Sequence, residues 1–171
     1  QKGGTPEILD RLEAGMLHYA AVIQEKLGVD ADHFEGAGAA GGLGAAFKVF
    51  LHANMKSGIE TVLDLIDFDH LLDGVDLVVT GEGRIDWQSA FGKVPSGIGM
   101  RCKKKGIPAV AIVGGMGDGA EKIYDFGVES ILPTINGAMD IEEALERADE
   151  LYKGAAGRMF RMLRAGMSLK K

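Results

Sequence analysis

Apolar residues in the first part of the chain recur every three or four positions, which is the spacing of one face of an amphipathic helix. The repeat runs from Ile8 to Leu27. Thr5 stands just before it, where its side chain can cap a helix, and Gly28 follows it, where glycine commonly ends one. The pattern therefore predicts one long helix over residues 5–27.

Two further helices are predicted in the next part of the sequence. Small and apolar residues over 45–50 predict a short buried helix. Ser57 and Glu60 have the spacing of a capping box, which opens a predicted helix over about 57–67. Residues 1–70 contain no strand pattern, so we expect this part of the chain to be mostly helical.

From residue 75 on, strand patterns alternate with helix patterns. Short apolar, β-branched runs predict strands that are buried on both faces. The predicted strands lie at 77–80, 108–113 and 130–132, and the predicted helices at 95–105, about 120–126 and 140–165. This alternation predicts an α/β fold with a doubly wound parallel sheet. We therefore expect a domain boundary near 68–75, with residues 1–71 in one lobe and 72–171 in an α/β domain.

The composition is that of a globular protein, with 46% apolar and 26% charged residues among 171. No apolar run approaches the roughly 18 residues of a membrane-spanning helix. A net charge of −6 argues against nucleic acid as the main partner. Cys102 is the only cysteine, which suits a reducing compartment, so we expect a cytoplasmic protein with no membrane partner. Because the chain starts at Gln1 without a Met, we expect it to be a piece of a longer protein.

Glycine supplies 26 of the 171 residues, and its first cluster reads GAGAAGGLG at 36–44. Gly36, Gly38 and Gly41 match the string of the dinucleotide fingerprint, which also needs a strand before it and an acidic residue about 20 positions after it. The preceding residues do not resemble a strand. Tight packing, or a bend in which Gly38, Gly41 and Gly42 approach an anionic ligand, is the better interpretation. An oxidoreductase domain that uses a dinucleotide stays open as an alternative.

The segment 81–93, GEGRIDWQSAFGK, carries most of the polar chemistry. It leaves the carboxyl end of the first predicted strand, where open α/β sheets bind their ligands. Arg84 can hold a carboxylate or phosphate through two hydrogen bonds, and Lys93 can bind phosphate as a point charge. Asp86, or else Glu82, can hold a divalent cation or accept a proton from a substrate hydroxyl. The remaining candidates for ligand binding in this segment are Gln88 and Ser89.

Glycines follow both of the first two predicted strands. They are Gly81 and Gly83 after the first strand, and Gly114, Gly115 and Gly117 after the second. Glycine at such a place lets the backbone turn and approach a ligand, and N–H groups at a helix start can bind phosphate. The second cluster lacks the Gly-Lys-Ser/Thr ending of a Walker loop. The alternative is that these glycines only make turns and that the neighbouring charges pair with one another.

Other polar groups are more simply explained as structure. The lysines at 103–105 end a predicted helix, where positive charge is favourable, and they would favour a thiolate at Cys102. Acidic residues within 64–73 lack the spacing of a calcium loop and are interpreted as a solvated helix face. The four histidines are scattered, with no second ligand at metal spacing. Met159 and Met162 fit a core stripe.

At 81–95 the sequence GEGRIDWQSAFGKVP resembles the motif of the type I glycerate kinases, a bacterial family that phosphorylates glycerate at its 2-position. Similar blocks occur in the expected order at 1–7 (QKGGTPE), 36–44 and 57–60 (SGIE). The positions that match the motif are Asp76, Thr80, Gly81, Glu82, Gly83, Arg84, Asp86, Gln88, Ser89, Gly92, Lys93 and Pro95. The chain departs from many members at Phe91, where they have His, and at Gly115, where they have Ser.

The resemblance implies a kinase that transfers phosphate from ATP, with Mg²⁺, to glycerate as its small-molecule partner. It implies two α/β domains with the active site between them, one domain being Rossmann- or flavodoxin-like. Residues from about 72 on would belong to that domain, and residues 1–71 to the second, inserted lobe. The chain would then be the C-terminal half of a longer enzyme whose N-terminal half is missing, and a homo-oligomer is left open.

The resemblance also supports roles for the charged residues of the motif. Asp86 would be the catalytic base or the Mg²⁺ ligand, with Glu82 as second choice. Arg84 and Lys93 would bind the substrate carboxylate or the transferring phosphate. A third hypothesis, beside the kinase and the oxidoreductase, is a non-catalytic module that binds an anion or a partner protein.

Overall fold

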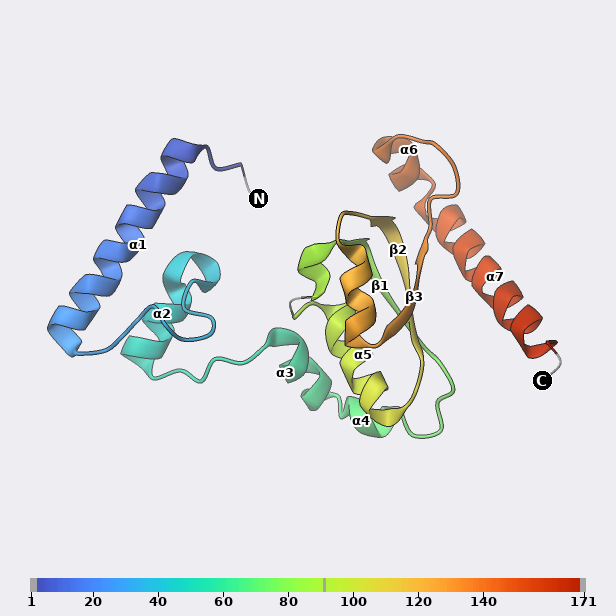
Figure 1. Cartoon of the computed structure of the whole chain (residues 1–171), viewed down its shortest axis with the longest axis horizontal. Helices are drawn as coiled ribbons and strands as arrows, with labels where there is room; N and C mark the ends of the chain where they lie inside the picture. Colours follow the sequence, from blue (N-terminus) through green and yellow to red (C-terminus); the bar gives the residue numbers. More distant parts are fainter. Residues whose placement is uncertain (1–2, 91, 170–171) are drawn as a thin grey trace. The chain divides into compact units, whose positions relative to one another are not determined.

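Two units make up the chain, which the computed structural model describes over residues 3–90 and 92–169 (Figure 1). The first unit ends at Lys56 and the second begins at Ser57. The described residues of the first unit contain no strand. Its helices are α1 (Pro6–Leu27) and α2 (Ala39–Leu51).

Helix α1 begins and ends where the sequence predicts. The Thr5 side chain accepts a hydrogen bond from the Ile8 amide at 3.4 Å, and Gly28 ends the helix in the left-handed conformation. Ile23 is buried, whereas Leu12 is 59% exposed, so part of the apolar face lies outside the core of this unit. That core consists of Ile23, Ala31, Ala45 and Val49, with Tyr19 and Phe34 packed against it.

The glycine cluster at 36–44 includes a left-handed turn that interrupts α2 near its start. Ala40, Gly41 and Gly42 have φ values of 51°, 70° and 93°. Because left-handed backbone is costly for residues with a Cβ, two of these three positions are glycine. Helix α2 includes the predicted segment 45–50 but begins earlier, at Ala39.

The second unit is an α/β arrangement. Among its described residues, no helix is both long and apolar enough to cross a membrane, and the same holds for the first unit. The strands are β1 (Val78–Ile85), β2 (Ala109–Met116) and β3 (Val128–Pro133). The α-helices are α3 (Gly58–Leu65), α4 (Phe68–Leu71), α5 (Val94–Lys105), α6 (Ile141–Glu146) and α7 (Ala148–Met167), and the 3-10 helices are η1 (Trp87–Ala90) and η2 (Ala120–Phe126).

The three strands form a parallel sheet in the order β1-β2-β3, as predicted. The predicted ends of the first two strands are wrong, because β1 continues past Thr80 to Ile85 and β2 continues to Met116. The pairing explains the extension, since Arg84 is in register with Gly115 and Ile85 with Met116. The glycines expected to follow the strands therefore lie mostly inside them.

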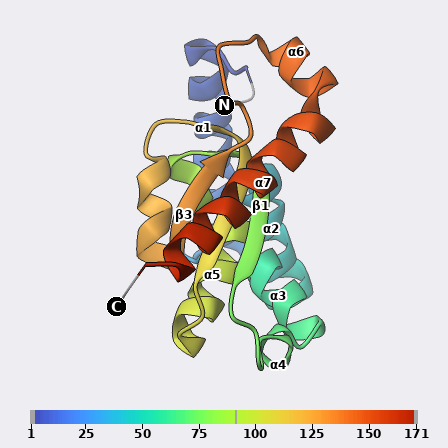
Figure 2. The same ribbon diagram turned by 90° about the vertical axis from the view of Figure 1, so that its right-hand side faces the viewer.

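Helices cover both faces of the sheet (Figures 1 and 2). On one face Ala111 and Val113 pack with Ile123 of η2, close to α5. On the other face Ile112 packs against Ala155 and Met159 of α7. The alternation along β2 is that of a strand buried on both sides, so the fold is α/β as the sequence predicts.

The single helix predicted over 140–165 is two helices. Asp140 caps α6, since its carboxylate accepts a hydrogen bond from the Glu143 amide at 2.8 Å. Arg147 then has non-helical backbone angles, φ −96° and ψ 13°, and α7 starts at the next residue. Of the two methionines assigned to a core stripe, Met159 is buried and Met162 is 73% exposed, so the second assignment was wrong.

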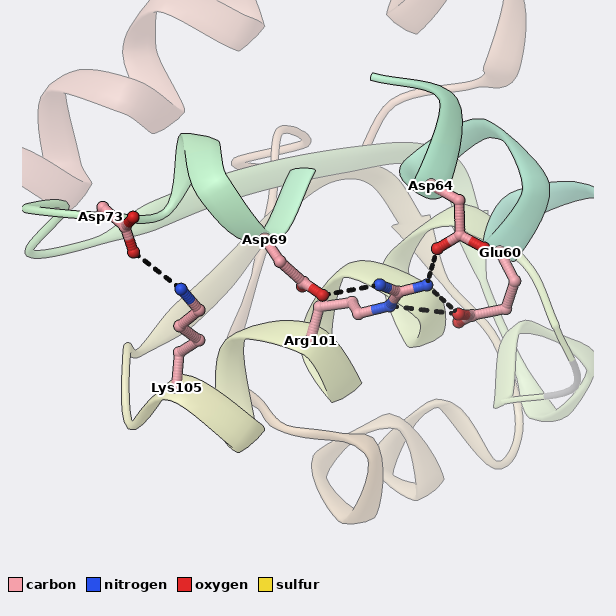
Figure 3. A network of polar contacts seen from close by, with 6 residues as sticks. All are labelled: Glu60, Asp64, Asp69, Asp73, Arg101 and Lys105. Carbon is pink, nitrogen blue, oxygen red and sulfur yellow. Dashed lines mark hydrogen bonds and ion pairs between the residues drawn. The ribbon is translucent and has the colours of Figure 1, made fainter. Parts of the chain in front are cut away.

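Arg101 connects α5 with α3 and α4, and Figure 3 shows its side chain among their carboxylates. Its guanidinium donates to Glu60 and Asp64 of α3, both at 2.5 Å, and to Asp69 of α4 at 2.8 Å. The Arg101 side chain is 14% exposed, and these hydrogen bonds, that of Asp64 first, raise its pKa above the usual value. These contacts place α3 and α4 in the second unit, so the division at Ser57 comes before the boundary expected near residue 72.

The same contacts change the interpretation of the predicted capping box. Helix α3 does begin after Ser57, but among the described residues the Ser57 side chain makes no capping hydrogen bond. The Glu60 carboxylate accepts two hydrogen bonds from Arg101, at 2.5 and 3.1 Å. An ion pair with a residue far along the sequence replaces the local cap.

Candidate functional site

A cavity of about 560 Å³ lies at the carboxyl ends of the strands. This is the edge at which open α/β sheets bind ligands. Its floor includes Gly83 and Arg84 of β1 and Gly114 and Gly115 of β2. Its opposite wall comes from α6 and α7 and includes Ile141, Leu145 and Tyr152.

The glycines of the floor differ in what surrounds them. A Cβ at Gly114 would lie 2.5 Å from the Gly83 carbonyl oxygen, so close packing of the two strands requires glycine there. A Cβ at Gly83 or Gly115 would meet nothing within 4 Å. At these two positions the missing side chain leaves open space, and the cavity reaches the backbone.

Arg84 lies beside this floor. A Cβ at Gly117 would come within 2.6 Å of the Arg84 guanidinium, which shows that the guanidinium lies against the Gly117 backbone. The Gly117 amide donates to the Ile85 carbonyl at 2.8 Å, which fixes the segment after β2 against the end of β1. The absence of a side chain at Gly117 thus leaves room for the Arg84 guanidinium at the edge of the cavity. There the guanidinium can hold an anion with two hydrogen bonds.

Asp86, Gln88 and Ser89 form the turn that follows β1. The Asp86 Oδ1 atom accepts from the Gln88 amide at 3.0 Å, and the Ser89 hydroxyl accepts from the Asp86 amide at 3.2 Å. Neither of these two hydrogen bonds involves the Asp86 Oδ2 atom. Ser89 is fully buried, and its hydroxyl takes part in the turn by accepting from the Asp86 amide. A contact between Ser89 and a ligand stays a prediction.

Glu82 and Lys93 line a different cavity, of about 320 Å³. Its other walls include Gly92 beside Lys93, and Ile59 and Val62 of α3. Of the charged residues of the segment 81–93, Glu82 and Lys93 line this cavity and Arg84 lines the larger one, whereas Asp86 is not among the described residues that line either. Phe91, one of the two positions where the chain departs from the motif, lies outside the described residues.

Residues 1–164 match the sequence model of the glycerate kinase family. The chain belongs to the glycerate kinase family. It is 40% identical to a glycerate kinase of Halalkalibacterium halodurans over 91% of this chain, and 36% identical to the glycerate 2-kinase of Escherichia coli K12 over 98% of it. It is also similar to the crystal structure of a Salmonella typhimurium LT2 protein assigned as glycerate kinase 2, with 37% identity and a TM-score of 0.67 over 99% of the chain.

The chain spans well under half the length of these glycerate kinase family members. The match covers 41% of the Halalkalibacterium relative, 44% of the Escherichia coli relative and 43% of the Salmonella structure. The activity of the whole protein is therefore stated below as a proposal.

Within this family member, the segment 81–95 runs through the end of β1, the η1 turn and the start of α5. It contributes Gly83 and Arg84 to the larger cavity and Glu82 and Lys93 to the smaller one. The segment that carries the resemblance thus contributes lining residues to both cavities.

The structure bears on a magnesium site at Asp86. The described residues contain no group of three or more His, Cys, Asp or Glu side chains that could hold a metal ion. Magnesium in phosphoryl-transfer sites is commonly held by one or two carboxylates together with substrate phosphates. A single carboxylate such as that of Asp86 is compatible with that mode, and a magnesium ion at Asp86 stays a prediction.

The glycines predicted to bind phosphate in the first unit differ among themselves in their surroundings. Gly38 and Gly41 are exposed, and a Cβ at either would meet nothing within 4 Å. Gly42 is buried, and a Cβ there would lie 2.8 Å from the Met16 methyl group. Among the described residues no strand precedes Gly36, so the structural context of a dinucleotide fingerprint is missing.

The lysines at the end of α5 do not act on Cys102 as expected. Cys102 is buried, and burial raises the pKa of its thiol, which opposes a thiolate. Lys103 donates to the Asp125 carbonyl at 3.0 Å and Lys105 to the Asp73 carboxylate at 2.7 Å. The Lys105 hydrogen bond, with a smaller contribution from His70, lowers the pKa of Asp73.

Sequence reasoning missed the apolar wall of the larger cavity. Ile141 and Leu145 are each 68% exposed and Tyr152 is 52% exposed. The sequence pattern indicates only that Ile141 and Leu145 are apolar positions of the helix predicted over 140–165. The available signal was their position directly after the Asp140 cap, because a helix that starts beyond the last strand of a parallel sheet begins at the carboxyl edge.

Proposed function

We propose that the protein containing this chain is a glycerate kinase that transfers the terminal phosphate of ATP to the 2-hydroxyl of glycerate. The observation that carries the proposal is a cavity at the carboxyl ends of β1 and β2 whose lining includes Gly83 and Arg84, two residues of the family motif. The names of the relatives at 35–40% identity support the same activity.

Phosphoryl transfer requires a protein mainly to position two reactants and to stabilise negative charge. Arg84 supplies a planar cation next to the glycine floor, where phosphate oxygens can approach the backbone. Magnesium, when bound, adds positive charge at the transferring phosphate. The Oδ2 atom of Asp86 is the group available to orient that ion or to accept the proton of the glycerate hydroxyl.

The smaller cavity suits the acceptor. Its volume of about 320 Å³ is ample for a three-carbon acid, and Lys93 places a cation there for the glycerate carboxylate. Glu82 lies in the same cavity and can accept a hydrogen bond from a glycerate hydroxyl. The two cavities would then hold the two substrates on either side of the end of β1.

A coupled assay for ADP release in the presence of glycerate tests the activity. It should be run on a protein of the relatives' full length that contains this chain, with the chain alone beside it. Asp86→Asn should lower kcat by at least about 10²-fold if Asp86 is the base, whereas the control Asp125→Asn, which changes an exposed residue of η2, should leave kcat unchanged. Absence of glycerate-dependent ADP release would reject the proposed activity, and 3-phosphoglycerate as product would reject the 2-position.

A titration of the chain with NAD(P) and with ATP separates the kinase from an oxidoreductase. Tight NAD(P) binding without ATP binding would favour the oxidoreductase, and binding of simple anions alone would favour a non-catalytic module. The cytoplasmic location, the homo-oligomer and the N-terminal half expected to complete the enzyme stay predictions.

A further inference from the structure

We infer that the larger cavity is the nucleotide site, with the base of ATP against the α6–α7 wall and its phosphates over Gly83 and Gly115 beside Arg84. This assignment rests on the proposed kinase function. It goes beyond that function by specifying which cavity binds which substrate. The term "base wall" is used below for Ile141, Leu145 and Tyr152.

The chemistry of the lining favours a nucleotide over glycerate. At about 560 Å³ the cavity is within the usual range for sites of drug-sized ligands. Arg84 is the only side chain with a full charge among the described residues that line it. Glycerate exposes a carboxylate and two hydroxyls, which the base wall would leave largely without hydrogen-bond partners. A nucleotide base has flat apolar faces that can lie against an aromatic ring and aliphatic side chains.

Polar recognition is available at the opposite side of the cavity, where the phosphates would lie. Gly83 and Gly115 have open space at their Cβ positions, so phosphate oxygens can approach the backbone of both strands. The Arg84 guanidinium lies against Gly117 at the same edge and can form two hydrogen bonds with a phosphate. The division into an apolar wall and a cationic, glycine-lined floor matches the two chemical halves of a nucleotide.

The base wall is held in place by the rest of the second unit. Ala155 and Met159 of α7 pack on Ile112 of β2, one and two turns beyond Tyr152. The Arg158 guanidinium donates to the Pro133 carbonyl at 3.1 Å, which attaches α7 to the end of β3. A wall fixed before the ligand arrives costs less free energy to order on binding.

Binding of ADP to the chain tests the assignment, measured by isothermal titration and by amide chemical shifts. Tyr152→Ala removes the aromatic part of the base wall, and Gly115→Val fills the floor without a backbone clash at Cβ. Each should raise the Kd for ADP by at least about 10-fold. The matched control is Phe160→Ala, because Phe160 is also an exposed aromatic residue of α7, at 64%, and does not line the cavity. Its Kd should change less than about 2-fold.

The outcomes separate this inference from the proposed function. ADP binding that is absent, or that is equal in all three variants and the original chain, would overturn the assignment of the cavity. So would a loss of glycerate binding, rather than ADP binding, in Tyr152→Ala and Gly115→Val. If ADP affinity falls as expected while the full-length protein shows no turnover of glycerate, the nucleotide site stands and the acceptor is a different compound. Because Tyr152 is exposed, its variant remains informative even if Gly115→Val disturbs folding.

Discussion

The two glycine-rich regions of this chain look alike in sequence and differ in structure. In the first unit, Gly42 and Gly44 are enclosed, and a Cβ at Gly44 would lie 1.9 Å from the Gly36 carbonyl oxygen. In the second unit, Gly83 and Gly115 face the open space of a cavity. In the first case glycine is needed because neighbouring atoms are close, whereas in the second case nothing described in the protein lies within 4 Å of the Cβ position.

The comparison shows that a high glycine content alone does not indicate a ligand-binding loop. Even within the cavity floor, Gly114 is a packing glycine, since a Cβ there would meet the Gly83 carbonyl oxygen at 2.5 Å. The test that separates the two kinds is whether adding a methyl group changes stability or ligand affinity. The predictions below use that test, with one on the contacts that hold the second unit together.

Gly44→Ala should have the largest effect on stability. Alanine would favour the helix by about 1 kcal/mol on propensity alone, but its methyl group would clash with the Gly36 carbonyl. Because backbone must shift, the free energy of unfolding of the first unit should fall by about 3 kcal/mol or more. Hydrogen exchange at the Ile23 and Val49 amides measures this, since both residues are buried in that unit. Unchanged exchange would show that the Gly36 carbonyl is not fixed against α2.

Gly114→Ala should destabilise the second unit by about 2 kcal/mol, less than the first change, because the clash with Gly83 is less severe. The single tryptophan, Trp87, lies at the end of β1 and reports on this unit by fluorescence during urea unfolding. Gly115→Ala is the matched control on the neighbouring residue and should leave the midpoint nearly unchanged. Equal losses of stability in Gly114→Ala and Gly115→Ala would contradict the distinction between glycines required by packing and glycines next to open space.

How far the sequence predicted this site depends on the range of the interactions concerned. The helix caps at Thr5 and Asp140 were predictable because donor and acceptor are three residues apart. The end of β1 was not, since glycines at 81 and 83 indicate a turn, whereas pairing with β2 keeps them in the strand. Tertiary pairing overrides local strand preference in such cases.

Two features of the second unit depended on residues far apart in the sequence. Glu60 has the spacing of a cap, but Arg101 binds it, and no local pattern indicates that pair. The base wall was missed for a related reason. Ile141 and Leu145 have helical spacing, which indicates burial against the same domain and cannot show that a cavity lies beside them.

Arg101→Met tests whether the ion pairs of Arg101 hold α3 and α4 to the rest of the second unit. The change leaves the carboxylates of Glu60, Asp64 and Asp69 without their shared cation, so we expect a loss of about 1–2 kcal/mol in urea unfolding followed by Trp87. Lys105→Met is the control, because it breaks one exposed pair with Asp73 and should change stability by less than about 0.5 kcal/mol. If the two variants behave alike, the Arg101 contacts contribute no more than an ordinary surface pair.

The smallest predicted effect, and the one that best tests the first glycine region, is that of Gly38→Ala. Gly38 has right-handed backbone angles, φ −76° and ψ −4°, and open space at its Cβ position, so alanine fits without strain. It should stabilise the first unit by about 0.5 kcal/mol by restricting the unfolded chain. Gly41→Ala has the same open space but a φ of 70°, and it should instead cost about 1 kcal/mol. Hydrogen exchange measures the stability of the first unit in both variants. The KM values of the full-length protein then show whether this region contacts a substrate. If Gly38→Ala keeps its KM for ATP and for glycerate while gaining stability, this region serves packing and turn formation, whereas a raised KM for either substrate would make Gly38 a ligand contact.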